Sequence, residues 1–154
     1  MKLLIALGAA CALSACATTG AEDATLTAIK SARLAPCPAP ATNARTTGET
    51  PARGITEAEL ARVALGNDSV GRALRLRRLT IAPDGVIAWH EHGARQGMAY
   101  VITGELTEYR NDCADAVKRR AGDVVQEGLG VAHYWRNESG ADAIIFVFDA
   151  PPPA

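Results

Sequence analysis

Residues 85–92 read GVIAWHEH and carry two of the chain's three histidines, His90 and His92. Valine, isoleucine and tryptophan in this stretch favour a β-strand. Side chains two apart in a strand share a face, so both imidazoles point the same way. The third histidine, His133, lies in a second strand-like run at residues 132–137. We therefore expect the three imidazoles to converge on one point.

Three convergent neutral imidazole nitrogens form a ligand set that suits a transition metal with open coordination positions. We expect one divalent transition metal (iron, zinc, manganese, nickel or copper) held by His90, His92 and His133. The Irving–Williams order favours copper and zinc at a three-nitrogen site, but geometry and supply decide the rest. The residue types therefore leave the identity of the metal open.

Seven segments have the short, turn-bounded apolar pattern of β-strands. They are residues 72–81, 86–92, 98–103, 105–110, 124–127, 132–137 and 143–149. A Pro-Asp-Gly turn at residues 83–85 separates the first two. Many short strands with such turns indicate an all-β sandwich or barrel. One short helix is expected before them, over residues 57–65, because Thr56 and Glu59 form a capping-box pattern.

The composition limits the number of domains and the kind of partner. The chain has 154 residues, with 16 basic and 17 acidic side chains and a formal net charge of −1. Nucleic-acid-binding domains usually carry a basic excess, so nucleic acid is excluded as a partner. All seven aromatic residues lie between Trp89 and Phe148. We therefore expect one domain of about one hundred residues, at residues 53–149, followed by a proline-rich tail at 150–154.

The N-terminus has the pattern of a bacterial secretion signal. A lysine precedes an apolar stretch at residues 3–13, which is too short to cross a hydrocarbon core of about 30 Å. Residues 13–16, Leu-Ser-Ala-Cys, resemble the lipobox of bacterial lipoproteins. The resemblance implies removal of residues 1–15 and lipidation of Cys16, and Ala17 after it favours the outer membrane, facing the periplasm. The alternative is ordinary signal cleavage nearby, which gives a soluble periplasmic protein.

Residues 16–52 are expected to form a disordered tether, because four prolines interrupt a sequence rich in alanine and threonine. Two cysteines remain after signal removal and lipidation, Cys37 in this tether and Cys113 in the domain. An oxidising compartment permits a disulfide between them. The alternatives are two free thiols, or Cys113 as a small buried residue.

The two histidine segments resemble the two sequence motifs of the cupin superfamily. Residues 85–104 resemble the first motif, with glycines at both ends and the two histidines between them. Residues 122–137 resemble the second, which contains His133 and ends at Asn137. The resemblance implies a double-stranded β-helix, or jelly-roll, barrel of about six to eight strands. It also implies that the motif histidines hold a metal inside this barrel.

The first cupin motif usually carries a glutamate ligand shortly after its second histidine. That position is Gly97 here, with Gln96 beside it. The resemblance therefore implies three histidines plus water, with Gln96 as a candidate oxygen ligand. Glu108 and Glu127 are nearby carboxylates, and strand parity alone does not say whether they enter the cavity.

Strand parity also predicts the cavity lining. Ala88 and Trp135 share the parity of the histidines in their own strands and are placed in the lining, together with Tyr100. Trp89 has the opposite parity and is expected to pack between layers. The basic run at residues 75–78 is interpreted as a solvated strand face rather than as an anion site.

Three functional hypotheses follow. The first is a metal-dependent enzyme acting on a small molecule, as a dioxygenase or isomerase-like enzyme, with Glu91, Glu127 and Tyr134 as acid–base candidates and no catalytic residue assigned. The alternative is a non-catalytic barrel that binds a small ligand or a metal, and a cavity without an acid–base group would favour it. The third is an interaction protein, for example a homodimer through the sheet edge at residues 74–79.

Overall fold

The structure is a computed structural model that describes residues 27, 29, 31–66 and 71–153. The predicted signal peptide and Cys16 lie outside the described residues. The described strands are β1 (Arg33–Leu34), β2 (Arg53–Ala64), β3 (Ala73–Glu91), β4 (Gly97–Thr103), β5 (Glu105–Arg110), β6 (Val117–Arg120), β7 (Asp123–Glu127), β8 (Ala132–Arg136) and β9 (Ala143–Asp149). Among the described residues, no helix has the length and hydropathy needed to span a bilayer.

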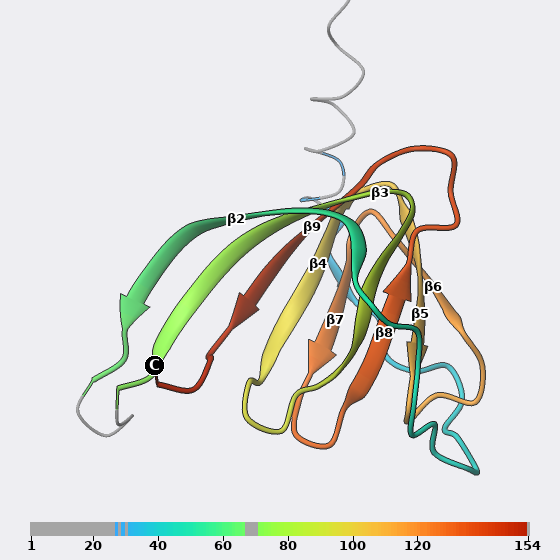
Figure 1. The fold of residues 1–154 in the computed structure, drawn as a ribbon, viewed down its shortest axis with the longest axis horizontal. Coiled ribbons are helices and arrows are strands. Elements are labelled where there is room, and N and C mark those ends of the chain that lie inside the picture. Colours follow the sequence, from blue (N-terminus) through green and yellow to red (C-terminus); the bar gives the residue numbers. More distant parts are fainter. Residues whose placement is uncertain (1–26, 28, 30, 67–70, 154) are drawn as a thin grey trace, which may run out of the picture.

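All nine strands belong to one curved sheet that forms a half-barrel (Figure 1). The strand order is β1-β7-β4-β9-β3-β8-β5-β6, and β2 pairs with β3 off this path. The long strand β3 pairs antiparallel with β9 through its first half and with β8 through its second half. Because β3 joins the two parts of the sheet, it brings the histidines of β3 and β8 to neighbouring positions. The prediction of an all-β fold is confirmed.

One face of the sheet carries the hydrophobic core. Residues alternate between buried and partly exposed along β9, and Ala99 and Val101 of β4 are inaccessible to solvent. The cluster also contains Leu79, Ile81, Leu106, Val125, Trp135, Ala143, Ile145 and Val147. Tyr100 lies between Ala99 and Val101 and therefore points to the other face. Tyr100 therefore does not point into the cavity lining to which it was assigned from the sequence.

Residues 53–64 form strand β2, where the sequence predicted a helix over residues 57–65. β2 runs antiparallel to β3 from Ala73 to Val86 of that strand. A helix at this place would leave the long edge of β3 unpaired, so tertiary pairing overrides the local capping pattern. β2 also covers one edge of β3 at residues 74–79, on which the homodimer was expected. The homodimer remains a prediction.

The second half of the predicted tether packs on the barrel. β1 pairs in parallel with β7, and the backbone NH of Trp89 donates to the carbonyl oxygen of Glu49. Cys37 and Cys113 form a disulfide, with Cα atoms 5.5 Å apart. Backbone pairing and this cross-link hold a proline-rich segment that has no apolar periodicity of its own. Within the predicted tether at residues 16–52, residues 33–41 and Glu49 thus contact the barrel.

Candidate metal centre

The three histidines meet where β3 lies beside β8. His90 pairs across the sheet with His133, and His92 follows directly after the last residue of β3. A register shift between Ile87 and His90 marks a β-bulge, which turns the end of β3. The Nε2 atom of His92 lies 3.0 Å from Nε2 of His90 and 2.9 Å from Nε2 of His133. The prediction that the three side chains form one group able to hold a metal is confirmed.

These nitrogen–nitrogen distances fit a single ion. Transition metals bind imidazole nitrogen at roughly 2.0–2.1 Å, so two ligands at a right angle lie about 3.0 Å apart. Three unprotonated nitrogens at this spacing repel one another through their lone pairs unless a cation lies between them. The donor set suits iron, zinc, manganese, nickel or copper, and it does not distinguish among them.

Two of the imidazoles are oriented by backbone carbonyl groups. Nδ1 of His90 donates to the carbonyl oxygen of Ala88 (2.8 Å), and Nδ1 of His92 donates to the carbonyl oxygen of Arg95 (2.9 Å). A proton on Nδ1 leaves the Nε2 lone pair free for a metal. Burial lowers the pKa of His90 to about 3 and that of His92 to about 4. Both rings are therefore neutral near pH 7, which is the form that binds a metal.

Glu108 orients the third imidazole. Its buried carboxylate accepts hydrogen bonds from Nδ1 of His133 (2.5 Å) and from Nε of Arg119 (2.7 Å). A third bond comes from Nη1 of Arg110 (3.3 Å). Burial alone would raise the pKa of Glu108, but the hydrogen bond from His133 and the charges of Arg119 and Arg110 hold it below its usual value. Glu108 is thus an anion that fixes the ring of His133, as carboxylates do beside zinc-binding histidines.

The triad opens into a cavity of about 260 Å³. His90 and His92 line it, and so do Ala88 and Trp135, which the parity argument placed there. Trp89 lines the cavity as well, although its parity predicted the opposite face. The β-bulge before His90 interrupts the strict alternation of the strand and accounts for this difference.

Comparison with known protein families assigns the fold. Residues 77–149 match the family model described as Cupin domain. These residues form a cupin domain. No curated protein matches the sequence.

Solved structures resemble the cupin domain in fold. KdgF from Halomonas sp. gives a TM-score of 0.53 at 15% identity, with 64% of this chain and 80% of that chain covered. The cupin domain of Schizosaccharomyces pombe Cnp3 gives 0.52 at 10% identity, covering 65% and 66%. The Cupin_2 domain of an XRE family transcriptional regulator from Enterobacter cloacae gives 0.50 at 14% identity, covering 65% and 99%. At these identities the likeness is one of fold alone.

Gln96 does not join the triad of the cupin domain. Its amide nitrogen donates to the carbonyl oxygens of His92 (3.0 Å) and Gly93 (2.5 Å). Its amide oxygen lies 3.4 Å from Nη2 of Arg72. The loop at residues 92–96 leaves carbonyl groups without strand partners, and the glutamine amide satisfies them. Gln96 therefore braces the loop, and its role as an oxygen ligand stays a prediction.

Glu127 is the carboxylate that the cupin domain brings to the triad. Its Oε1 atom lies 3.6 Å from Nε2 of His133, and its Oε2 atom lies 3.8 Å from Nδ1 of His92. Burial raises the pKa of Glu127 to about 7. The sequence named Glu127 as one of several candidates without placing it. Its shared parity with the buried Val125 on β7 is the signal that could have placed it.

The other two acid–base candidates lie elsewhere. Glu91 is exposed at the end of β3. The ring of Tyr134 stacks on that of Tyr109, with centroids 4.5 Å apart, and Tyr134 does not line the cavity in the described part of the chain. Glu127 is therefore the candidate that the structure brings to the histidines.

The basic run at residues 75–78 is not a solvated face as a whole. Arg78 is exposed, as expected, but Arg77 is buried and lines the cavity. Arg75 and Arg77 share the inward parity of Leu79 on β3, and both bind the carboxylate of Asp149. The interpretation as a solvated face is therefore wrong for these two arginines, because Asp149 compensates their charge inside the fold.

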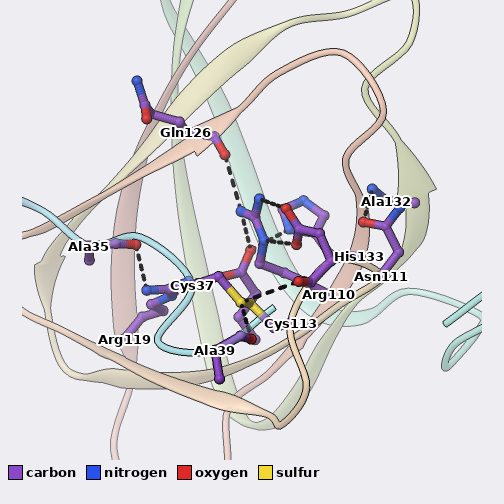
Figure 2. The surroundings of a disulfide bond; sticks show 12 residues. Ala35, Cys37, Ala39, Arg110, Asn111, Cys113, Arg119, Gln126, Ala132 and His133 are labelled. Carbon is purple, nitrogen blue, oxygen red and sulfur yellow. Dashed lines mark hydrogen bonds and ion pairs between the residues drawn. A yellow bond between two sulfur atoms is a disulfide. The ribbon is translucent and has the colours of Figure 1, made fainter. Parts of the chain in front are cut away.

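The N-terminal strap, residues 35–41, lies beside Arg119 and is cross-linked to the barrel by the disulfide between Cys37 and Cys113 (Figure 2). Nη1 of Arg119 donates to the carbonyl oxygen of Ala35 (2.7 Å). The same guanidinium donates to Glu108, which orients His133. A continuous chain of polar contacts therefore joins the strap to the metal centre.

Proposed function

We propose that the protein is a mononuclear metal-dependent enzyme of the bacterial cell envelope that acts on a small molecule in the cavity of its cupin domain. The observation that supports this proposal is the convergence of three Nε2 atoms, with neighbours at 2.9 and 3.0 Å, while every Nδ1 atom is held by an acceptor. Such pre-organisation favours a metal centre over a general polar pocket.

The residues around the centre are arranged for chemistry on a bound molecule. When bound there, a divalent transition metal supplies Lewis-acid polarisation of an oxygen or activation of a water. Glu127 places a carboxylate beside the triad, within reach of a molecule held between them. Apolar side chains such as Ile87 and Trp135 line the same cavity and exclude water. An acid–base group in the cavity favours an enzyme over the non-catalytic barrel.

The location in the envelope is proposed from the N-terminal sequence. The Leu-Ser-Ala-Cys segment at residues 13–16 supports lipidation of Cys16, and several acyl chains at one residue give stable anchoring. Mass spectrometry of the mature protein tests this. A diacylglyceryl adduct on Cys16 as the first residue supports the outer-membrane lipoprotein, whereas a mature chain without the adduct indicates the soluble periplasmic alternative.

Elemental analysis tests the metal centre. The protein is purified from the cell envelope without chelators or metal affinity resin and compared with a His90→Ala/His133→Ala double variant. We expect close to one equivalent of a single transition metal in the parent and none in the double variant. Circular dichroism and Gln96→Ala, which changes a nearby polar side chain outside the triad, serve as controls. An absence of bound metal after reconstitution with each of the five metals would contradict the proposal.

The identity of the bound metal decides which activity is measured. If iron is found, oxygen consumption is assayed, because a dioxygenase needs dioxygen. Zinc, manganese or nickel would lead to isomerisation and hydrolysis assays. A metal-replete protein that turns over no substrate in either set would favour the alternative of a small-ligand-binding or metal-binding barrel.

A further inference from the structure

One buried carboxylate, Asp149, is shared by three guanidinium groups. Arg75 binds it through two hydrogen bonds of 2.9 and 2.7 Å, and Nη2 of Arg77 donates to it over 3.0 Å. Nε of Arg95 lies 3.6 Å from the same carboxylate, which is too far for a hydrogen bond. Arg75 and Arg77 therefore occupy the short contacts, and Arg95 is left with a weaker one.

The guanidinium of Arg95 has donors that are not used. Arg77 has a second carboxylate partner, because its Nη1 donates to Glu57 over 3.0 Å. Among the residues that the structure describes, Asp149 is the sole side-chain partner of Arg95. Around Asp149, three guanidinium groups thus share two hydrogen-bonded carboxylates, Asp149 and Glu57. Arg95 holds the weakest of these contacts, and its side chain is 32% exposed.

Arg95 lies in the wall of the cavity that contains the histidines. It shares this wall with Arg77, His90 and His92. The loop at residues 92–96 carries both His92 and Arg95, and the bond from His92 Nδ1 to the Arg95 carbonyl oxygen ties their positions together. Gln96 braces the same loop through its bonds to backbone carbonyl groups. The backbone that carries Arg95 is therefore tied to His92 of the metal centre.

The rest of the lining is mainly apolar. Aliphatic side chains come from several strands around the cavity: Ile55, Leu79, Ile87, Ile145 and Val147. Two carboxylates also line it: Glu57 is paired with Arg77, and Glu127 lies beside the ring nitrogens of His133 and His92. An anionic group that enters near Arg95 therefore meets a partly exposed guanidinium and a hydrocarbon surface.

We propose that this cavity binds a small aliphatic carboxylate, whose carboxylate group pairs with Arg95 and whose hydrocarbon part lies along the apolar wall toward the histidine triad. The planar fork of a guanidinium matches the two oxygens of a carboxylate, which neutral amides and alcohols do not offer. The inference rests on the proposed function and names the substrate class of that enzyme.

Isothermal titration calorimetry tests this with two probes of the same shape, 3-methylbutanoate and its neutral amide. We expect the parent protein to bind the acid at least about tenfold more tightly than the amide, because a charge-assisted pair is worth roughly 1.5–3 kcal/mol. In Arg95→Gln the two probes should bind within about twofold of each other. In Arg95→Lys the charge stays without the planar fork, so an intermediate preference is expected.

The matched control is Arg78→Gln, which removes an exposed arginine of β3 outside the cavity and should keep the full preference for the acid. Equal binding of acid and amide by the parent, a preference retained in Arg95→Gln, or no binding of the acid at about 20 mM would each overturn the inference. Metal content is measured on the same samples. If the metal is bound but the protein does not prefer the acid over the amide, only the carboxylate ligand is rejected. If the metal is missing, the proposed function is rejected.

Discussion

Glu108 accepts a hydrogen bond from Nδ1 of His133 over 2.5 Å, and this contact connects the metal centre with the wall of the barrel. The other two histidines are oriented by carbonyl oxygens of their own strand and loop. His133 instead depends on a side chain from β5, which in turn depends on Arg119 from β6. The orientation of this ligand is therefore set by non-local contacts, and it can be weakened without a change in the triad itself.

Substitution of this anchor should weaken metal binding. In Glu108→Gln the negative charge that holds the His133 ring is lost, and Arg119 and Arg110 lose their shared anion. We expect metal affinity to fall about 10–100-fold, measured by competition with a chromophoric chelator. The control is Glu138→Gln, because Glu138 accepts hydrogen bonds from a threonine and a tyrosine away from the triad. Equal affinities of Glu108→Gln and the parent would reject the anchoring role.

Loss of the disulfide should affect both stability and metal binding. The cross-link joins residues separated by 76 positions, and opening a disulfide of this kind typically costs roughly 2–4 kcal/mol of the free energy of unfolding. Release of the strap also frees Ala35, whose carbonyl oxygen holds Arg119. Urea unfolding of the parent with and without a dithiol, and of Cys37→Ser/Cys113→Ser without it, should show this loss. An unchanged unfolding midpoint after reduction, or no two-dalton mass change, would contradict the prediction.

The triad could be predicted because the sequence gives two of its histidines locally and the third through a motif. His90 and His92 are two apart in a strand, and the resemblance to the cupin motifs brought His133 to them. The fourth position could not be predicted in the same way. Gln96 was predicted from its place in a motif, but its amide nitrogen donates to a backbone carbonyl oxygen of the short loop. Glu127 comes from β7, and its approach depends on how that strand crosses the sheet.

The other sequence-based predictions that the structure contradicts failed for one physical reason. The capping pattern before residue 65 was overridden by the edge of β3, which pairs with the whole of β2. The alternation that placed Trp89 opposite His90, between layers, was interrupted by a β-bulge. Arg75 and Arg77 read as a solvated face because their common partner, Asp149, lies at the far end of the chain. In each case the deciding contact is distant in sequence.

The role of Gln96 as a loop brace leads to a prediction that separates bracing from ligation. Gln96→Ala removes bonds to two backbone carbonyl groups but no metal ligand. We expect the metal content to stay close to one equivalent, while the preference for the acid probe over its amide falls because Arg95 is less firmly held. Elemental analysis and calorimetry on the same preparation measure both. A loss of the metal would contradict this prediction.

The Asp149 cluster should give the protein a specific sensitivity to acid. Burial alone would raise the pKa of Asp149, but the hydrogen bond from Arg75 and the charges of Arg77, Arg75 and Arg95 hold it below its usual value. An aspartate in the unfolded chain titrates at about pH 3.9. The stabilisation is therefore fully present above about pH 5, and it is lost as the pH falls through the lower pKa of the folded state.

Asp149→Asn removes the stabilisation that the ionised Asp149 carboxylate provides, at every pH at which that carboxylate is ionised in the parent. At pH 7 it leaves Arg75 and Arg77 without their shared anion, and we expect a loss of about 3–5 kcal/mol in the free energy of unfolding. Between about pH 5 and pH 3 the stability of the parent should fall toward that of the variant, and chemical unfolding at a series of pH values measures both curves. Asp142→Asn, at an exposed position, should follow the parent. Parallel curves for the parent and Asp149→Asn would mean that this carboxylate does not carry the acid sensitivity.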